Sequence, residues 1–204
     1  MTQIKEPVPE YGELLVKVEA FSVNRGETFL LEPGPPYPVP AGWRPGKDIA
    51  GLVVQAAADG TGPGIGQRVV AHPAAAGWAE YAAVPTGRVA TLPDQVPAVT
   101  AAALPLAGLT ALRLLRTAGC VAGKRLLITG ATGGVGHYFT ELATGAGGEV
   151  TAVSTRGDRL AALGAESMAT APRRRGGSCC WRACRPWCSR RWARRCSGGY
   201  LPGT

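Results

Sequence analysis

Short segments that alternate apolar and polar residues fill the N-terminal part of the chain. Residues 12–23 (GELLVKVEAFSV) have this period of two, which predicts a half-buried β-strand. Glycine-rich separators such as DGTGPGIG mark turns between further segments of this kind. Those segments are residues 49–56, 67–73, 78–85 and 88–93. Several short strands joined by turns predict a small, mainly antiparallel β domain, which we place at residues 1–98.

The pattern changes near residue 99, where helix-forming residues become frequent. Residues 99–118 are rich in Ala and Leu, and Pro105 and Gly108 interrupt them. Because proline cannot continue a helix, two helices or one broken helix are predicted here. Gly119 fits the residue type that commonly ends a helix.

Two short apolar runs then flank a glycine-rich stretch and a helical segment. The runs are residues 125–129 (RLLIT) and 149–154 (EVTAVS), and each predicts a buried strand. Strand, glycine-rich turn, helix and strand make one βαβ unit of about 30 residues. The chain is therefore predicted to belong to the α/β class.

The glycine-rich stretch carries the clearest chemical signal in the sequence. From Ala131 it follows the pattern A-x-G-x-x-G, a variant of the dinucleotide-binding fingerprint. Small residues there allow a tight turn, a close approach of the backbone to a pyrophosphate, and close packing of helix and strand. An ordinary glycine turn is the alternative in a chain this rich in glycine. The predicted cofactor-binding residues are Ala131, Thr132, Gly133, Gly134, Val135 and Gly136.

The end of the second strand indicates which nicotinamide cofactor is bound. A site for NAD expects an acidic residue there, whereas this chain has Ser154, Thr155 and Arg156, with no acid before Asp158. Hydroxyl groups and a guanidinium accept a 2′-phosphate, which a carboxylate would repel. We therefore predict NADP (NADPH) as cofactor, with a solvated loop charge as the alternative role for Arg156.

Charge divides the chain into two unlike parts. The formal net charge is +8, but residues 1–171 carry 13 Lys and Arg against all 14 Asp and Glu. Residues 172–204 carry nine Arg and no acid. The body is thus nearly neutral, and the basicity gives no reason to expect that it binds nucleic acid.

The segment 172–204 also departs from the body in composition. It holds five of the six Cys and three of the five Trp, and it shows neither helical nor strand periodicity. A zinc site and an Arg/Trp nucleic-acid-binding arm are two interpretations, but the segment has no His and no CxxC pair. A third is GC-rich coding DNA translated out of frame, and this is the interpretation we favour. We then expect an aberrant, irregular tail on a truncated, frameshifted chain.

Nothing in the sequence predicts a membrane segment. No apolar run reaches the roughly 18 residues of a spanning helix. The N-terminus carries Lys5, Glu6 and Glu10, which do not fit a signal peptide. We therefore expect a cytoplasmic protein with a small-molecule substrate.

Six strings follow one another along the chain in a recognisable order: FSVNRGE (21–27), GKDIAG (46–51), GQRV (66–69), GWAEYAAVP (77–85), AAALPLAGLTAL (101–112) and GATGGVG (130–136). In these strings the chain resembles the medium-chain dehydrogenase/reductase superfamily, and most closely its zinc-free quinone oxidoreductases (the zeta-crystallin-like branch). The resemblance implies a GroES-like β domain followed by a Rossmann domain, a doubly wound parallel sheet that binds NADPH in the cleft between the two. It also implies hydride transfer to a quinone or an activated enone or carbonyl, and a homodimer for the full-length family member.

Zinc-dependent members of the superfamily resemble the chain as well, so their ligand positions need comparison. Their catalytic Cys corresponds to Asn24 and their His to Lys47, and an amide and an ammonium cannot replace a thiolate and an imidazole on zinc. A four-Cys structural zinc lobe is absent, because no Cys precedes Cys120. The resemblance therefore implies no metal.

Two residues carry the catalytic roles that the resemblance implies. Asn24 is expected to face the nicotinamide or the substrate, and Thr110 to lie by the cofactor at the domain junction. A turn-forming amide and a helix-cap hydroxyl are the alternative roles. The two histidines are expected to be a structural residue at a strand end (His72) and a solvated helix residue (His137).

The chain departs from the family pattern at both ends. The opening β-hairpin of the family is expected to be missing, and the recognisable sequence ends near Ala171. We therefore expect residues 99–171 to be a partial Rossmann domain with two certain strands and one crossover helix. A cofactor-binding remnant without catalysis is the alternative function.

Overall fold

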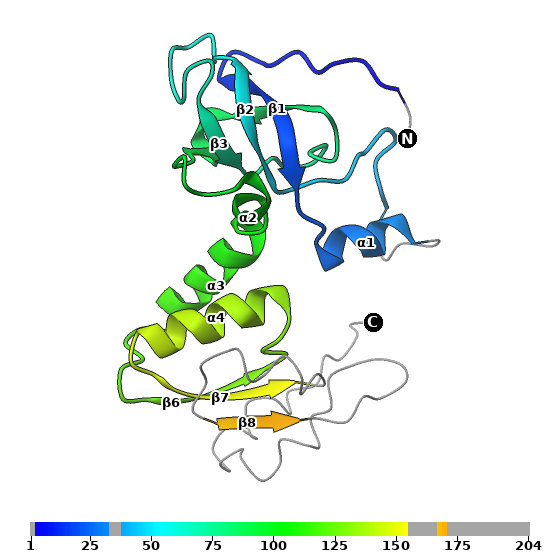
Figure 1. Cartoon of the computed structure of the whole chain (residues 1–204). Coiled ribbons are helices and arrows are strands. Elements are labelled where there is room, and N and C mark those ends of the chain that lie inside the picture. The colour runs from blue at the N-terminus through cyan, green and yellow to red at the C-terminus, as the bar shows by residue number, and fades with distance from the viewer. Residues whose placement is uncertain (1–2, 33–37, 155–166, 171–204) are drawn as a thin grey trace, which may run out of the picture.

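The computed structural model describes residues 3–32, 38–154 and 167–170. An antiparallel sheet lies at one end and a parallel sheet at the other, with two consecutive helices between them (Figure 1). The predicted division of the chain at residue 98 falls where the first of these two helices begins. Predictions for the segment 172–204 lie outside the described residues.

Five strands form the antiparallel sheet, in the order β4-β1-β2-β3-β5. Each strand pairs with its neighbours in antiparallel fashion, which confirms the predicted β domain. The strands are β1 (Glu13–Phe21), β2 (Ile49–Gln55), β3 (Arg68–Ala71), β4 (Tyr81–Pro85) and β5 (Val89–Thr91). A short helix, α1 (Arg25–Leu31), follows β1, and a 3-10 turn (Thr86–Arg88) joins β4 to β5.

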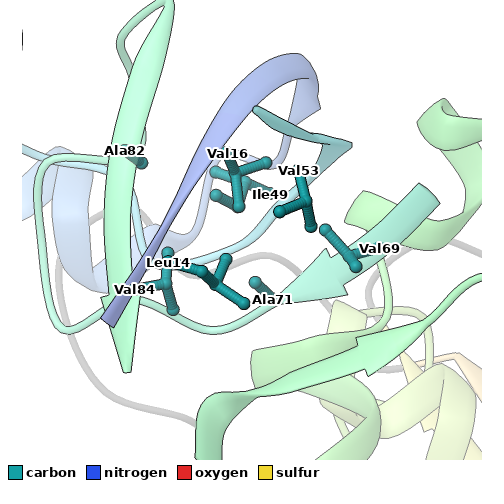
Figure 2. Packing of buried hydrophobic residues seen from close by; sticks show 8 residues of the cluster. All are labelled: Leu14, Val16, Ile49, Val53, Val69, Ala71, Ala82 and Val84. Atoms are coloured by element: carbon teal, nitrogen blue, oxygen red, sulfur yellow. The ribbon is translucent and has the colours of Figure 1, made fainter. Parts of the chain in front are cut away.

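The core of this sheet is made of its apolar alternate positions (Figure 2). In register, Val16 on β1 lies opposite Val53 on β2 and Ala82 on β4. Full burial of one Val or Leu side chain contributes roughly 1.5–3 kcal/mol, so the alternation seen in the sequence specifies which face is buried. The buried residues are Leu14, Val16, Ile49, Val53, Val69, Ala71, Ala82 and Val84.

Two helices connect the sheets, as the interruption at Pro105 predicts. Helix α2 (Ala98–Ala102) packs against β1 and β2, and α3 (Pro105–Ala118) begins with proline in its first turn. Proline suits this position because its missing N–H has no intrahelical partner there. Gly119 forms the C-cap of α3 with φ +74°, which confirms the predicted end of the helix. No helix in the described ranges is long and apolar enough to cross a membrane.

The parallel sheet contains β6 (Arg125–Thr129), β7 (Glu149–Ser154) and β8 (Ser167–Thr170), in the order β6-β7-β8. Helix α4 (Gly134–Gly145) joins β6 to β7 and packs along α3, so the predicted βαβ unit is confirmed. A third parallel strand, β8, adds to the two strands that the sequence predicts, because apolar periodicity does not single out a four-residue segment.

Burial differs between the two strands that the sequence predicts to be buried. On β7 the alternate residues Val150, Ala152 and Ser154 are buried. On β6 only Ile128 is buried, and Leu127 is 44% exposed. The prediction of a buried first strand was therefore wrong for β6, because this strand pairs with β7 alone among the described strands.

Candidate cofactor and active site

The turn between β6 and α4 has a backbone that requires glycine at two positions. Gly130 has φ +70°, and its carbonyl oxygen accepts a hydrogen bond from the N–H of Gly133 at 2.9 Å. A Cβ added to Gly136 would lie 2.3 Å from that same carbonyl oxygen and 2.9 Å from the Cα of Ala131. Ala131 is fully buried. Glycine at these two positions thus lets the turn fold tightly against the start of α4.

The start of α4 is suited to an anion. Gly133 is the N-cap, and the first N–H groups of any helix have no intrahelical acceptor. The first turn of α4 contains no acidic residue that would compete with a phosphate. A pocket of about 590 Å³ opens beside the turn, bordered by Gly133, Gly134 and the apolar side chains of Leu114, Leu127 and Phe139. Backbone donors, a glycine cradle and this open space fit the pyrophosphate of a dinucleotide.

The end of β7 is tied to the same turn. The N–H of Ala131 donates to the carbonyl oxygen of Val153 at 3.2 Å, and the hydroxyls of Thr132 and Ser154 are hydrogen-bonded to each other. Ser154 is only 5% exposed. The structure therefore brings Thr132 and Ser154 together. The predicted Thr155 and Arg156 lie outside the described residues.

A buried aspartate organises a second group of polar residues, at the start of β2. Asp48 is completely buried, and each of its carboxylate oxygens has two hydrogen-bond partners. The Oδ1 atom lies 2.9 Å from Nδ1 of His72 and accepts from the N–H of Leu106 at 2.9 Å. The Oδ2 atom accepts from the hydroxyl of Ser22 at 2.7 Å and from Nδ2 of Asn24 at 2.8 Å. All four acceptor positions of this carboxylate are used.

The predicted catalytic Asn24 belongs to this group and begins α1. Asn24 is the N-cap of α1, and its backbone N–H donates to Oε2 of Glu27 at 3.1 Å, which is one half of a capping box. Glu27 is 1% exposed, and its Oε1 accepts from the N–H of Gly46 at 2.6 Å. Asn24 is thus held between two buried carboxylates, those of Glu27 and Asp48.

The predicted Thr110 lies in the interior of α3, so the alternative role as a helix cap was wrong. Its hydroxyl donates to the carbonyl oxygen of Leu106 at 2.6 Å, one turn earlier in the helix. The N–H of the same Leu106 is bound by Asp48. Ala107, which follows Leu106 in α3, faces the glycine turn, because a Cβ added to Gly134 would lie 3.6 Å from the Cβ of Ala107. The first turn of α3 therefore connects the Asp48 group to the glycine turn.

The residues at the positions of the zinc ligands do not form a metal site. Nδ2 of Asn24 is engaged with oxygen acceptors, and Lys47 offers an ammonium, which is a donor only. Within the described ranges, no three residues of the types His, Cys, Asp and Glu are grouped so that they could hold a metal ion. The donor set around Asn24 therefore does not fit zinc.

Sequence reasoning missed most members of the Asp48 group. Asp48 and Glu27 appear in the strings that carry the family resemblance, but neither was predicted to be a site residue. His72 was expected to be structural, and the geometry places its ring on Asp48. Partners of Asp48 lie 24–58 residues away along the chain, which local patterns do not connect. A buried-strand pattern that begins with an acidic residue, such as KDIAG, is the one local signal that could have indicated Asp48.

The fold and this site define an α/β protein with a GroES-like β domain and a glycine turn of the dinucleotide-binding type. Residues 10–94 match the family described as the alcohol dehydrogenase GroES-like domain. A chloroplast envelope quinone oxidoreductase homolog from Arabidopsis thaliana is 36% identical over 163 residues, which are 74% of this chain and 49% of the relative. The chain spans about half the length of the curated relatives it matches.

Solved structures give the same result. The quinone oxidoreductase of Thermus thermophilus, solved with and without NADPH, is 31% identical with a TM-score of 0.71; the match covers 83% of this chain and 55% of that one. A mycobacterial protein solved in complex with NADPH is 31% identical with a TM-score of 0.75, over 84% of this chain and 54% of its own. These matches confirm the resemblance seen in the sequence to the medium-chain dehydrogenase/reductase superfamily and, within it, to the quinone oxidoreductases.

Proposed function

We propose that this chain carries the machinery of an NADPH-dependent, zinc-independent oxidoreductase whose substrate is a quinone or an activated enone or carbonyl. The observation that carries the proposal is the glycine turn at the start of α4, where a Cβ on Gly136 would collide with the backbone. Relatives named as quinone oxidoreductases and neighbours solved with NADPH support the same function.

The proposed site divides into a binding part and an orienting part. Residues 131–136 would hold the pyrophosphate through backbone N–H groups at the helix start. Ser154, Thr155 and Arg156 would face the ribose with its 2′-phosphate. When bound, NADPH would supply the hydride, while Asn24 and Thr110 orient the reacting groups at the junction of the two sheets. The fixed contacts of Asn24 with Asp48 and of Thr110 with Leu106 preorganise that junction.

Binding and turnover test the proposal separately. The full 204-residue chain is titrated with NADPH while the cofactor fluorescence is recorded, and is then mixed with NADPH and 1,4-naphthoquinone while the absorbance of NADPH is followed. We expect saturable binding and oxidation that depends on the quinone. A folded chain that binds NADPH without oxidising it would support a non-catalytic binding role instead, and a chain that does not bind it would contradict the proposal.

Cofactor choice is tested by Arg156→Ala. If the guanidinium holds the 2′-phosphate, the variant loses roughly 1.5–3 kcal/mol of NADPH binding, the range for a charged hydrogen bond, while NADH binding hardly changes. Isothermal titration with both cofactors measures this difference. An equal loss for both cofactors would mean that Arg156 acts on the pyrophosphate or on packing.

The partners of the chain follow from the same proposal. A small-molecule substrate and NADPH are proposed, and a homodimer is proposed for the full-length family member. We also propose a cytoplasmic location, although relatives of the chain include proteins named as chloroplastic. Size-exclusion chromatography with light scattering measures the oligomeric state, and a monomer of the full-length protein would contradict the dimer.

A further inference from the structure

The protonation pattern of His72 follows from the hydrogen bonds of Asp48. Two of the four groups bonded to Asp48 are N–H groups, which can donate a hydrogen bond but cannot accept one. They are the backbone N–H of Leu106 and the side-chain amide of Asn24. An ionised carboxylate accepts from all four groups, whereas a protonated one would need an acceptor for its own hydrogen. Nδ1 of His72 therefore donates to Oδ1 of Asp48, and in the neutral ring Nε2 is the atom without a hydrogen.

The His72 ring is partly accessible to water, and one of its nitrogens has no hydrogen-bond partner among the described residues. The His72 side chain is 31% exposed, whereas Asp48 is fully buried. Nδ1 is fixed on Asp48, and no described residue is hydrogen-bonded to Nε2. Such an imidazole has one nitrogen fixed and one free to take up or release a proton.

His72 is linked to the proposed cofactor site through Asp48 and α3. Asp48 binds both the ring of His72 and the N–H of Leu106. The neighbour of Leu106 in α3, Ala107, faces Gly134 of the glycine turn. The carboxylate of Asp48 and the first turn of α3 thus connect His72 to the start of α4.

Four other polar side chains of the junction are poorly suited to supply a proton. Asn24 has an amide, which does not transfer its hydrogens in catalysis. The Thr110 hydroxyl donates to a backbone carbonyl of its own helix. The carboxylates of Asp48 and Glu27 are buried and hydrogen-bonded as acceptors. His137, the second histidine of the chain, lies exposed on α4.

We propose that His72, oriented by Asp48, is the proton donor of the reaction; this rests on the proposed function. Hydride transfer moves a hydrogen with its electron pair to the quinone or enone, so the cofactor is oxidised and the substrate is reduced. The reduced substrate then carries a negative oxygen. The N–H bond at Nε2 of protonated His72 breaks, an O–H bond forms on the substrate, and the exposed ring regains its proton from water. Asp48 is a positioning residue in this step, because it touches His72 and not the substrate.

The first experiment reads the tautomer and needs neither cofactor nor turnover. The full chain with His137→Gln leaves His72 as the one histidine, so its ring nitrogens can be assigned in a long-range proton–nitrogen NMR spectrum. We expect the neutral ring to carry its hydrogen on Nδ1. A neutral ring protonated on Nε2 would overturn the proposal.

The second experiment separates proton transfer from a purely structural role. In His72→Asn the side-chain amide can still donate to Asp48, but nothing replaces Nε2. We expect a folded variant that binds NADPH within about twofold of wild type. Its kcat with 1,4-naphthoquinone should be at least about 100-fold lower, and added imidazole should restore part of it. His137→Gln serves as the matched control and should keep the wild-type kcat.

Besides the wrong tautomer, three outcomes would overturn the inference. Wild-type turnover by a folded His72→Asn variant leaves the histidine with a structural role only. If this variant does not fold, diethyl pyrocarbonate is applied to the His137→Gln chain, where unchanged turnover after modification of His72 also overturns the inference. A wild-type chain that binds NADPH but reduces no acceptor overturns the proposed function, and the inference with it.

Discussion

Within the glycine turn, Gly136 is the residue whose identity the backbone geometry constrains most directly. Gly136→Ala would place a methyl group 2.3 Å from the carbonyl oxygen of Gly130, so the turn or the helix must shift. We expect a loss of roughly 1–3 kcal/mol in the free energy of unfolding, the range for overpacking, together with weaker NADPH binding. Urea unfolding and a fluorescence titration measure the two effects.

Gly145 provides the matched control in the same helix. It is the last residue of α4, and an added Cβ would meet nothing within 4 Å. Gly145→Ala should therefore stabilise the chain by up to about 1 kcal/mol, because alanine favours helix more than glycine. If both variants behaved alike, the close approach at Gly136 would not be the cause.

Asp48 is the residue on which the largest loss of stability is expected. Asp48→Ala leaves four donors without their acceptor in a buried place, including the N–H of Leu106 and the amide of Asn24. Breaking a buried charged network in this way costs about 3–5 kcal/mol. Urea unfolding should show this loss, whereas Asp94→Asn, at an exposed aspartate, should change the free energy of unfolding by no more than about 0.5 kcal/mol. A loss below about 1 kcal/mol for Asp48→Ala would contradict the hydrogen-bond pattern.

At the scale of elements, the turn between β2 and β3 contains a carboxylate with a shifted titration. The backbone N–H of Thr61 and then its hydroxyl donate to Oδ1 of Asp59 and lower the pKa of Asp59 below its usual value. Because the folded-state pKa is lowered, the carboxylate contributes stability above the pKa of the unfolded chain. That contribution is lost as the pH falls through the folded-state pKa.

Substitution of Thr61 tests this assignment of the cause. Thr61→Ala removes the hydroxyl but keeps the backbone N–H, so the pKa of Asp59 should rise part of the way towards its ordinary value. Thr61→Ser keeps the hydroxyl and should leave the pKa of Asp59 close to that of wild type. Carboxyl NMR chemical shifts followed against pH measure both, and an unchanged pKa of Asp59 in Thr61→Ala would contradict the role of the hydroxyl.

Elements with a strong local signal were predictable from the sequence, and contacts between distant segments were not. The alternation around Val16, the proline at residue 105 and the glycine at residue 119 each act within a few residues, so the antiparallel strands and the broken helix could be predicted. Strand β8 is too short to show a period. The Asp48 group depends on β1, β2, β3 and α3 meeting in space, which requires the tertiary fold.

At the scale of the whole molecule, two consecutive helices, α2 and α3, connect the two sheets. Helix α2 covers part of the antiparallel sheet, and α3 packs along α4, whose first residues form the glycine turn (Figure 1). Asp48 fastens the start of α3 to the antiparallel sheet. A substrate near Asn24 and a cofactor on α4 would therefore be positioned relative to each other by α3.

The free side of β6 leads to the last prediction, which concerns association between molecules. Among the described strands β6 pairs with β7 alone, and Leu127 on β6 is 44% exposed. Leu114 on α3 is 49% exposed and borders the same pocket as Leu127, so the strand edge adjoins an apolar surface. Unpaired edges and exposed apolar patches of this kind promote association.

We expect the chain to self-associate as its concentration rises. Leu127→Lys should reduce this association without loss of unfolding free energy, since a charge on an edge strand opposes pairing with another strand. Val99→Lys, which replaces an apolar residue that is 76% exposed on α2, is the control and should leave association unchanged. Sedimentation velocity over a range of concentrations measures the effect, and a wild-type chain that stays monomeric throughout would contradict it.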